Sequence, residues 1–147
     1  GLTLTQPWAS LVALGHKRVE TRGWRSNYYG PVLIHAAKGF PKPAQVFAAE
    51  ECALGRISRH LCFSAVVAVA EIVAYQPAEE AALAISGIER RLGDYSPGRW
   101  AWSLDNVRAL PEPVPAAGHP GLWKVGPELE ESVLAALTRA PGGQDAG

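Results

Sequence analysis

The chain has 147 residues, of which 48% are hydrophobic and 19% charged, and its formal net charge is zero. This composition is typical of one globular domain and excludes a disordered chain, while a neutral total excludes attraction of nucleic acid or membrane by an overall field. The longest apolar run, Ala65 to Ala70, is far shorter than the roughly 20 residues of a membrane span, and the N-terminus has no secretory pattern. We therefore expect a soluble cytoplasmic domain.

Hydrophobic periods of two and of three to four residues, separated by glycine and proline, indicate short strands with helices between them. In chain order the expected elements are a strand at 2–5, a helix at 7–14, a strand at 19–22, a loop at 23–30, a strand at 31–37, a helix at 44–53, a strand at 63–75, a helix at 77–92, a strand at 99–104, a proline-rich loop or edge at 110–120, a strand at 122–125 and a helix at 128–139.

Five or six strands result, without strict alternation of strand and helix and without a glycine-rich phosphate loop after the first strand. This pattern argues against a doubly wound parallel sheet. It predicts an α+β fold, a small mixed β-barrel with flanking helices. Residues 1–140 are expected to form a single domain, and residues 141–147 a flexible C-terminal tail.

The segment from Gly15 to Lys38 is the most basic part of the chain and carries aromatic side chains. Its charged residues are Lys17, Arg18, Glu20, Arg22, Arg25 and Lys38, and its aromatic residues are Trp24, Tyr28 and Tyr29. On a strand at 19–22 the period of two places Glu20 and Arg22 on the same face. The aromatic residues either pin the loop or form a stacking platform for bases.

Two further polar residues interrupt apolar strands. A carboxylate such as Glu71 must reach solvent, find a partner or take up a proton. Alternation places it on the face of Val67, Val69 and Val73, so we expect Glu71 to face a cleft or to pair with a lysine or an arginine. His35 is either a hydrogen-bonded core histidine or a ligand contact.

Metal and nucleophile motifs are missing from the sequence. The four histidines lie far apart, and no pair has the spacing of a metal site. Cys52 and Cys62 lack metal-ligand spacing as well, and we expect two buried thiols in a reducing compartment. No serine or cysteine nucleophile pattern is present. We expect neither a metal nor a cofactor.

The opening Gln6-Pro7-Trp8-Ala9, followed by Gly15-x-Lys17-x-x-Glu20-x-Arg22, resembles the ASCH domain (activating signal cointegrator homology), a branch of the PUA-like superfamily. The similarity continues through Trp24-Arg25 and Gly30 to Lys38. The pair Trp100-x-Trp102 and the segment Gly121 to Lys124 are also similar to the family. This resemblance implies a PUA-like β-barrel with a cleft beside the Lys17 loop, in a family whose members bind RNA or modified nucleotides.

One bacterial branch of that family removes the acetyl group of N4-acetylcytidine, and another member has been described as a ribonuclease. The amidohydrolase branch uses a lysine in this loop, a threonine three positions later and a glutamate on a later strand. Lys17 matches the lysine and Glu71 is a match for the glutamate. The middle position carries Glu20, and Thr21 cannot replace the threonine because its side chain would face the other side of the strand.

Three hypotheses follow, the first being a binding module. In it Lys17, Glu20 and Arg22 share a cleft that recognises RNA, a nucleotide or a modified nucleobase. The other ligand contacts would come from the aromatic residue Trp24, from His35, and from the phosphate contacts Arg25 and Lys38.

The second hypothesis is a small hydrolase acting on a modified nucleoside or on RNA. Lys17 and Glu71 would be its acid/base pair, with Glu20 beside them. The third hypothesis is a protein-interaction module. The sequence leaves the oligomeric state open.

Overall fold

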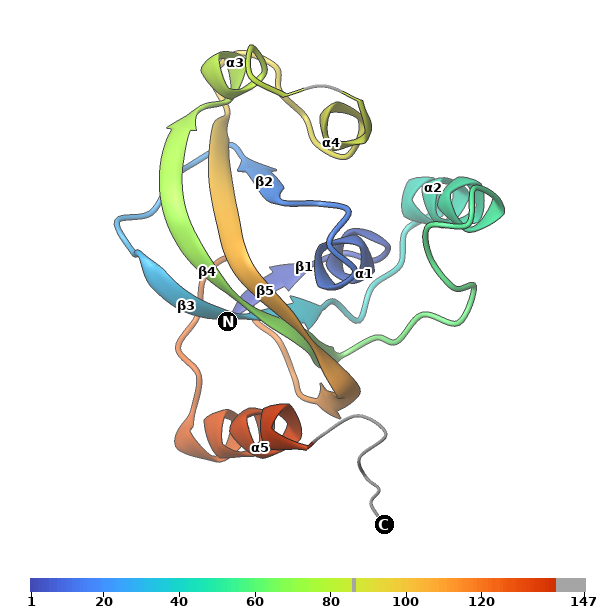
Figure 1. The fold of residues 1–147 in the computed structure, drawn as a ribbon, viewed down its shortest axis with the longest axis vertical. Helices are drawn as coiled ribbons and strands as arrows, with labels where there is room; N and C mark the ends of the chain where they lie inside the picture. Colours follow the sequence, from blue (N-terminus) through green and yellow to red (C-terminus); the bar gives the residue numbers. More distant parts are fainter. Residues whose placement is uncertain (86, 140–147) are drawn as a thin grey trace.

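A computed structural model describes residues 1–85 and 87–139, which form one strongly curved five-stranded sheet with helices around it (Figure 1). The elements in chain order are β1 (Leu2–Leu4), α1 (Trp8–Ala13), β2 (Val19–Arg22), β3 (Gly30–Ala36), α2 (Lys42–Ala53), β4 (Ala65–Pro77), α3 (Ala78–Ala81), α4 (Ile88–Arg91), β5 (Trp100–Pro115) and α5 (Pro127–Thr138).

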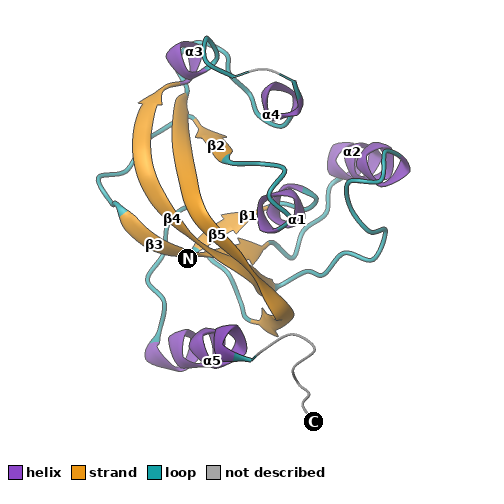
Figure 2. Cartoon of the chain, in the orientation of Figure 1, coloured by secondary structure: helices purple, strands orange, loops and turns teal. Residues whose placement is uncertain are grey.

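The sheet has the strand order β1-β3-β4-β5-β2, in which β1 and β3 are parallel and the other pairs antiparallel. This confirms a mixed α+β fold with flanking helices. The prediction of a closed barrel was wrong, because the edge strands β1 and β2 do not pair with each other. The short helix α1 packs in the opening, against β1, β3, β4 and β5 (Figure 2). A single side chain, Arg22, crosses from β2 to the Thr3 carbonyl of β1 at 2.8 Å.

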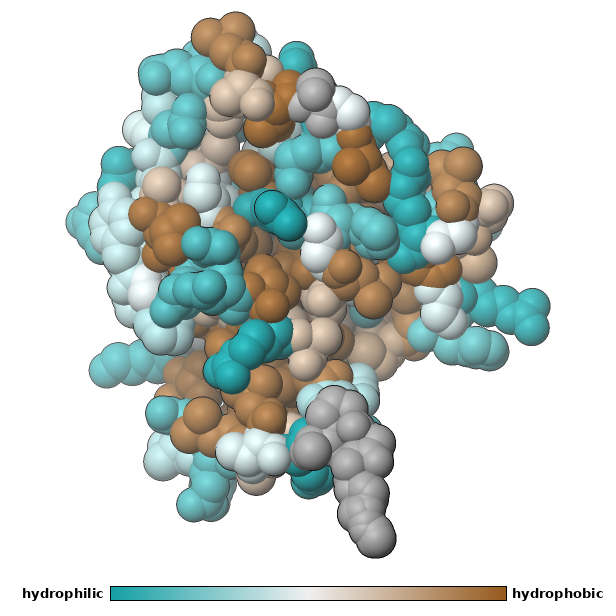
Figure 3. Space-filling view, viewed as in Figure 1, coloured by the Kyte–Doolittle hydropathy of each residue, from teal (hydrophilic) through white to brown (hydrophobic). Residues whose placement is uncertain are grey.

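The two sides of the sheet bury different clusters. On the concave side Leu2, Ile34, Ile72 and Trp102 pack with α1 in the main core. On the convex side α5 covers a second cluster that includes Val66 and Val133. Apolar side chains reach the surface beside α5 at the bottom of the view (Figure 3). Helix α1 thus covers the concave side of the sheet and α5 covers part of the convex side, with a gap left between the edge strands β1 and β2.

Strand β5 is much longer than predicted, because it continues into the proline-rich segment. Pro111, Pro113 and Pro115 lie in its second half, where β4 is its neighbour on one side and no other described strand pairs with it. Proline lacks the N–H that a ladder needs, but an edge tolerates it. The expectation of an edge in this region is therefore confirmed for residues 110–115.

Other local predictions were wrong in detail. The helix expected at 77–92 is two short helices, α3 and α4, and Gly87 has a positive φ of 63° directly before α4. The strand expected at 122–125 is only an isolated bridge between Leu2 and Leu122. Cys52 and Cys62 are free thiols, each partly rather than fully buried. The tail expected from residue 141 lies outside the described residues.

Candidate functional site

A cleft of about 670 Å³ lies at the gap between the two edge strands. The ends of β1 and β2 form two of its sides, and residues of α1, α2 and the turn after α4 complete it. It is lined by Thr3, Leu4, Thr5, Trp8, Glu20, Thr21, Arg22, Pro43, Phe47, Arg91, Leu92, Gly93, Asp94 and Arg99. The predicted pair Glu20 and Arg22 faces this cleft from the same side of β2.

Three arginines from different elements reach the cleft. The Nε of Arg22 donates to Glu20 at 2.8 Å. Arg99, just before β5, donates to the carbonyls of Thr21 and Asp94, each at 3.1 Å. Each guanidinium is thereby held by an acceptor of the fold and keeps further N–H donors.

Arg91, the third arginine, is anchored by an acid inside the protein. Its guanidinium lies 3.5 Å from the carboxylate of Glu51 on α2, whose side chain is 0% exposed. Arg56 contacts the same carboxylate at 3.0 Å. The Arg91 side chain is 48% exposed. Because Arg56 already neutralises Glu51, the Arg91 charge adds to the positive potential of the cleft.

Two acids share the cleft with the three arginines. Glu20 is bound on both sides, by Arg22 and by Lys17 at 3.4 Å. Asp94 accepts hydrogen bonds from the hydroxyl and the backbone N–H of Ser96, at 2.6 and 3.1 Å. These bonds, with a smaller contribution from Arg99 at 3.5 Å, hold the pKa of Asp94 below its ordinary value. Asp94 is thus an ionised acceptor, and by formal charge the three arginines exceed the two acids of the lining by one.

An aromatic pair forms another side of the cleft. The rings of Trp8 on α1 and Phe47 on α2 are stacked, with centroids 5.2 Å apart and planes 7° from parallel. Both side chains are half-buried. The cleft therefore combines guanidinium donors, carboxylate acceptors and a flat apolar wall.

Lys17 lies behind this cleft and does not line it. Its side chain is 1% exposed, and the ammonium donates to the carbonyls of Val19 at 2.6 Å and Leu92 at 3.0 Å, besides the ion pair with Glu20. Two of the three N–H donors of the ammonium thus bind backbone carbonyls, and its charge is paired with Glu20. Lys17 therefore holds the turn before β2 against the carbonyl at the end of α4.

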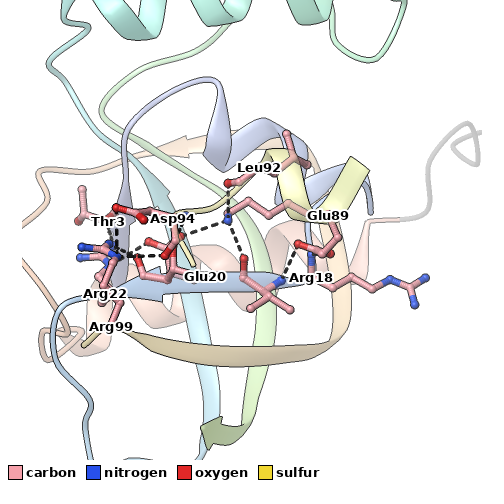
Figure 4. Close-up of polar contacts among 11 residues, drawn as sticks. Thr3, Arg18, Glu20, Arg22, Glu89, Leu92, Asp94 and Arg99 are labelled. Atoms are coloured by element: carbon pink, nitrogen blue, oxygen red, sulfur yellow. Dashed lines mark hydrogen bonds and ion pairs between the residues drawn. The ribbon is translucent and has the colours of Figure 1, made fainter. Parts of the chain in front are cut away.

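Glu89 of α4 also joins these two segments, and here the acceptor is a side chain and the donors are backbone groups. Its carboxylate accepts from the backbone N–H groups of Arg18 at 2.8 Å and Val19 at 3.2 Å (Figure 4). Lys17 and Glu89 thus form a reciprocal clamp, which we call the β2–α4 clamp. Figure 4 also shows Glu20, Arg22, Asp94 and Arg99 gathered beside Thr3. The clamp fixes the strand on which Glu20 and Arg22 stand.

Trp24 and Arg25 lie outside the cleft, in an aromatic cluster on the loop between β2 and β3. The Trp24 ring meets the buried Trp102 ring edge-on at 4.8 Å, and the Trp102 indole donates to the Trp24 carbonyl at 3.0 Å. The Arg25 guanidinium lies over the rings of Tyr75 and Trp100, 4.8 and 5.3 Å from their centroids. The prediction left open whether these aromatics pack or stack; Trp24 does pack, but remains 42% exposed.

His35 and Lys38 lie at a separate pocket, near the loop that follows β5. His35 is buried, with Nε2 2.7 Å from the Ala116 carbonyl and Nδ1 3.3 Å from the Thr3 hydroxyl. Both ring nitrogens are therefore used within the fold, as in the core-histidine alternative. Lys38 is exposed at the rim of this pocket.

Glu71 does not meet Lys17. It accepts a 2.6 Å hydrogen bond from Asn106 and shares the convex face with Val73, which is 47% exposed. The expectation of a cleft-facing or cation-paired Glu71 was wrong for this reason. Alternation placed Glu71 correctly beside Val73, but that face is open at this end of β4. The structure thus separates the acid/base pair of the hydrolase hypothesis.

The model of the ASCH domain family matches residues 2–113 of this sequence. The chain belongs to the ASCH domain family. Among solved structures it is similar to the ASCH protein of Zymomonas mobilis, with 15% identity, a TM-score of 0.58, and coverage of 91% of this chain and 92% of that one. Two single-residue mutants of that protein match with TM-scores of 0.57 at 15% identity, covering 91% of this chain and 92% and 94% of theirs. A comparison with curated protein sequences finds no match.

Several cleft residues of this ASCH domain carried no signal in the sequence. Arg91 and Arg99 look like ordinary surface arginines, and Glu51 and Glu89 like helix charges. The partners of Arg91 and Glu89 are 40 to 71 positions away in the sequence. Short motifs cannot show such pairs. In the sequence Trp8 stands out only within the family opening, and Phe47 is an apolar residue of the helix expected at 44–53.

Residues 1–85 and 87–139 contain neither a metal-ligand cluster nor a membrane-spanning helix. No three histidine, cysteine or acidic side chains of this part of the ASCH domain are grouped as metal ligands would be. No described helix has the length and hydrophobicity needed to cross a membrane.

Proposed function

We propose that this ASCH domain binds RNA through one nucleotide held in the cleft, whether its base is unmodified or modified. The observation that carries the proposal is the convergence of Arg22, Arg91 and Arg99 from three separate elements on one cleft. Planar guanidinium groups are well suited to phosphate, which accepts paired N–H bonds. The chain as a whole is neutral, so such a local concentration of arginine is the electrostatic feature that a polyanion would meet.

The remaining cleft groups fit the other parts of a nucleotide. The stacked pair of Trp8 and Phe47 offers a flat apolar wall to a base. Glu20, oriented by Lys17 and Arg22, has spare acceptor sites for the amino group of a base edge. Asp94 stays ionised and can accept from ribose hydroxyls. In this proposal Lys17 positions Glu20 and does not touch the ligand.

The contacts of Lys17 and Glu71 favour a binding function over hydrolysis by these two residues. The Lys17 ammonium is bound to two backbone carbonyls and paired with Glu20, and Glu71 is bound to Asn106 on the convex face. A general acid or base must lie within hydrogen-bond reach of the proton it moves. We therefore do not assign an acid/base pair to this site.

Isothermal titration of 5′-nucleotides, N4-acetylcytidine and single-stranded RNA tests the proposal. Replacing Arg99 (Arg99→Gln) is expected to weaken nucleotide binding about tenfold or more, since charge-assisted bonds to phosphate are lost. The matched control is Arg59→Gln, because Arg59 is exposed and outside the cleft. RNA affinity should also fall as salt rises. Binding that is indifferent to both Arg99→Gln and salt would contradict the proposal.

A further inference from the structure

The aromatic side chains that the ASCH domain exposes are concentrated on one loop. Among the large hydrophobic side chains exposed in the described chain, the aromatic ones are Trp24, Tyr28 and Tyr29, at 42, 44 and 55%. All three lie between β2 and β3. Large exposed aromatics have a cost in water, and their clustering marks a contact surface rather than scattered surface residues.

Arg25 makes part of this loop into a positively charged aromatic surface. Its guanidinium covers the rings of Tyr75 and Trp100, and its Nη2 donates to the Tyr29 hydroxyl at 3.3 Å. The Tyr29 ring meets Tyr75 edge-on at 5.2 Å. We call Trp24, Arg25 and Tyr29, with Tyr75 and Trp100 beneath them, the aromatic platform. Trp24, Arg25 and Tyr29 are exposed to solvent, and contacts with neighbouring rings hold them in place.

The aromatic platform lies on the same face of the sheet as the cleft residues. Glu20 pairs with Trp102 across β2 and β5, and Trp102 pairs with Tyr75 across β5 and β4. Cross-strand partners point to the same side of a sheet. In the next row Arg22 pairs with Trp100. The distance from Glu20 to Tyr75 is two strand spacings, about 10 Å.

A β-bulge puts Tyr75 on this face. The register of β4 against β5 shifts between Ile72 and Ala74, so Glu71 faces the convex side although it lies four residues before Tyr75. Without the extra residue, Tyr75 would share the face of Glu71. The bulge thus extends the concave face by one aromatic ring, on which Arg25 rests.

We infer that the ligand is a single strand of several nucleotides, whose bases next to the cleft-bound nucleotide stack on the aromatic platform. The inference rests on the proposed function and adds its substrate class. Stacking on aromatic rings and on arginine planes suits unpaired bases of any sequence, whereas a duplex keeps its bases covered. The Arg25 charge complements the phosphates of the same strand. A free nucleoside would use the cleft alone.

The test compares a 5′-mononucleotide with single-stranded RNA and DNA hexamers and with a duplex, by titration at physiological salt. Each stacked base is expected to strengthen binding about tenfold, so a hexamer should bind at least tenfold more tightly than the mononucleotide. Trp24→Ala and Tyr29→Ala should each remove much of this gain and leave mononucleotide affinity unchanged. Tyr29→Ala removes a side chain that is 55% exposed and keeps Trp102 covered by Trp24.

Tyr28→Ala is the matched control. Tyr28 is an exposed aromatic of the same loop, but it lines the separate pocket beside α5 and its hydroxyl donates to the Pro31 carbonyl. The hexamer gain should survive this substitution.

Different results would contradict the single-strand inference and the proposed function. Equal affinity for mononucleotide and hexamer, or a gain that survives both Trp24→Ala and Tyr29→Ala, overturns the single-strand inference and leaves the cleft proposal standing. A duplex that binds as tightly as the single strands also overturns it. If neither mononucleotide nor hexamer binds, the proposed function itself fails.

Discussion

Two neighbouring segments of this ASCH domain, 17–22 and 24–29, use their basic side chains in opposite ways. In the first, Lys17 is 1% exposed and bound to two backbone carbonyls of the fold, and Glu20 and Arg22 are bound to each other. In the second, the rings and the Arg25 guanidinium stand on top of other aromatics and face solvent. The first segment builds the cleft, and the second offers a surface beside it.

A charged residue in a sequence motif therefore does not by itself indicate contact with a ligand. A buried ammonium is tolerated only when acceptors surround it, and those acceptors then fix its surroundings. An exposed guanidinium over aromatic rings keeps a free face. Four experiments test this contrast between a buried and an exposed basic residue.

Lys17→Met should cause the largest loss of stability. It leaves the carbonyls of Val19 and Leu92 without a donor and removes one cation from Glu20. Breaking such a buried pair costs about 3–5 kcal/mol in the free energy of unfolding, which urea denaturation would measure. Lys38→Met, at an exposed site, should stay within about 0.5 kcal/mol. A stable Lys17→Met protein that no longer binds nucleotide would assign Lys17 to the ligand instead.

Glu89→Ala should cause a smaller loss of stability, because it removes only the Glu89 contacts of the β2–α4 clamp and keeps those of Lys17. Two backbone N–H groups, of Arg18 and Val19, lose their carboxylate acceptor. Since water can replace part of this contact, we expect a loss of about 1–2 kcal/mol in urea denaturation. Glu131→Ala on the exposed face of α5 is the control. A Glu89→Ala protein as stable as the control would show that the clamp depends on Lys17 alone.

Tyr29→Ala, on the aromatic platform, should change stability least among the three variants. It removes an edge-on contact with Tyr75 and a hydrogen bond from Arg25, both at the surface. We expect a loss of no more than about 1 kcal/mol by thermal or urea unfolding. A loss as large as that of Lys17→Met would mean that this loop is as firmly built into the fold as the first segment.

The smallest effect concerns the ionisation of Asp94. Its folded-state pKa is lowered, so its contribution to stability is present above the unfolded value, near 3.8, and is lost as pH falls through the folded pKa. Ser96→Ala removes the hydroxyl donor and should move the Asp94 pKa upward, as followed by carboxyl NMR titration. An unchanged titration would assign the lowered pKa to the backbone N–H of residue 96 and to Arg99.

Periodicity and turn residues were enough to predict most strands and the family resemblance, because these features depend on neighbours in sequence. They could also place Glu20 and Arg22 on one face. They could not show that the barrel stays open, since this depends on α1 packing in the opening of the sheet, against β1, β3, β4 and β5. Nor could they show that Leu92 would take the Lys17 ammonium, 75 positions away.

The error over Glu71 has a similar origin. Alternation shows which residues share a face, but not whether another element covers that face. Helix α5 covers Val66 and Val69 and leaves Val73 exposed. Arg91 and Arg99 were missed because an exposed arginine has no distinctive pattern until tertiary contacts bring it to a cleft.

The prolines of β5 have a consequence for the behaviour of the protein at high concentration. Pro111, Pro113 and Pro115 occupy every second position, so their missing N–H groups lie on one side of the strand. Because β4 pairs along the other side, that side is the free edge. A strand from a second molecule would find carbonyl groups there and no donors. The longest strand of the sheet is thus protected against edge-to-edge aggregation along its open end.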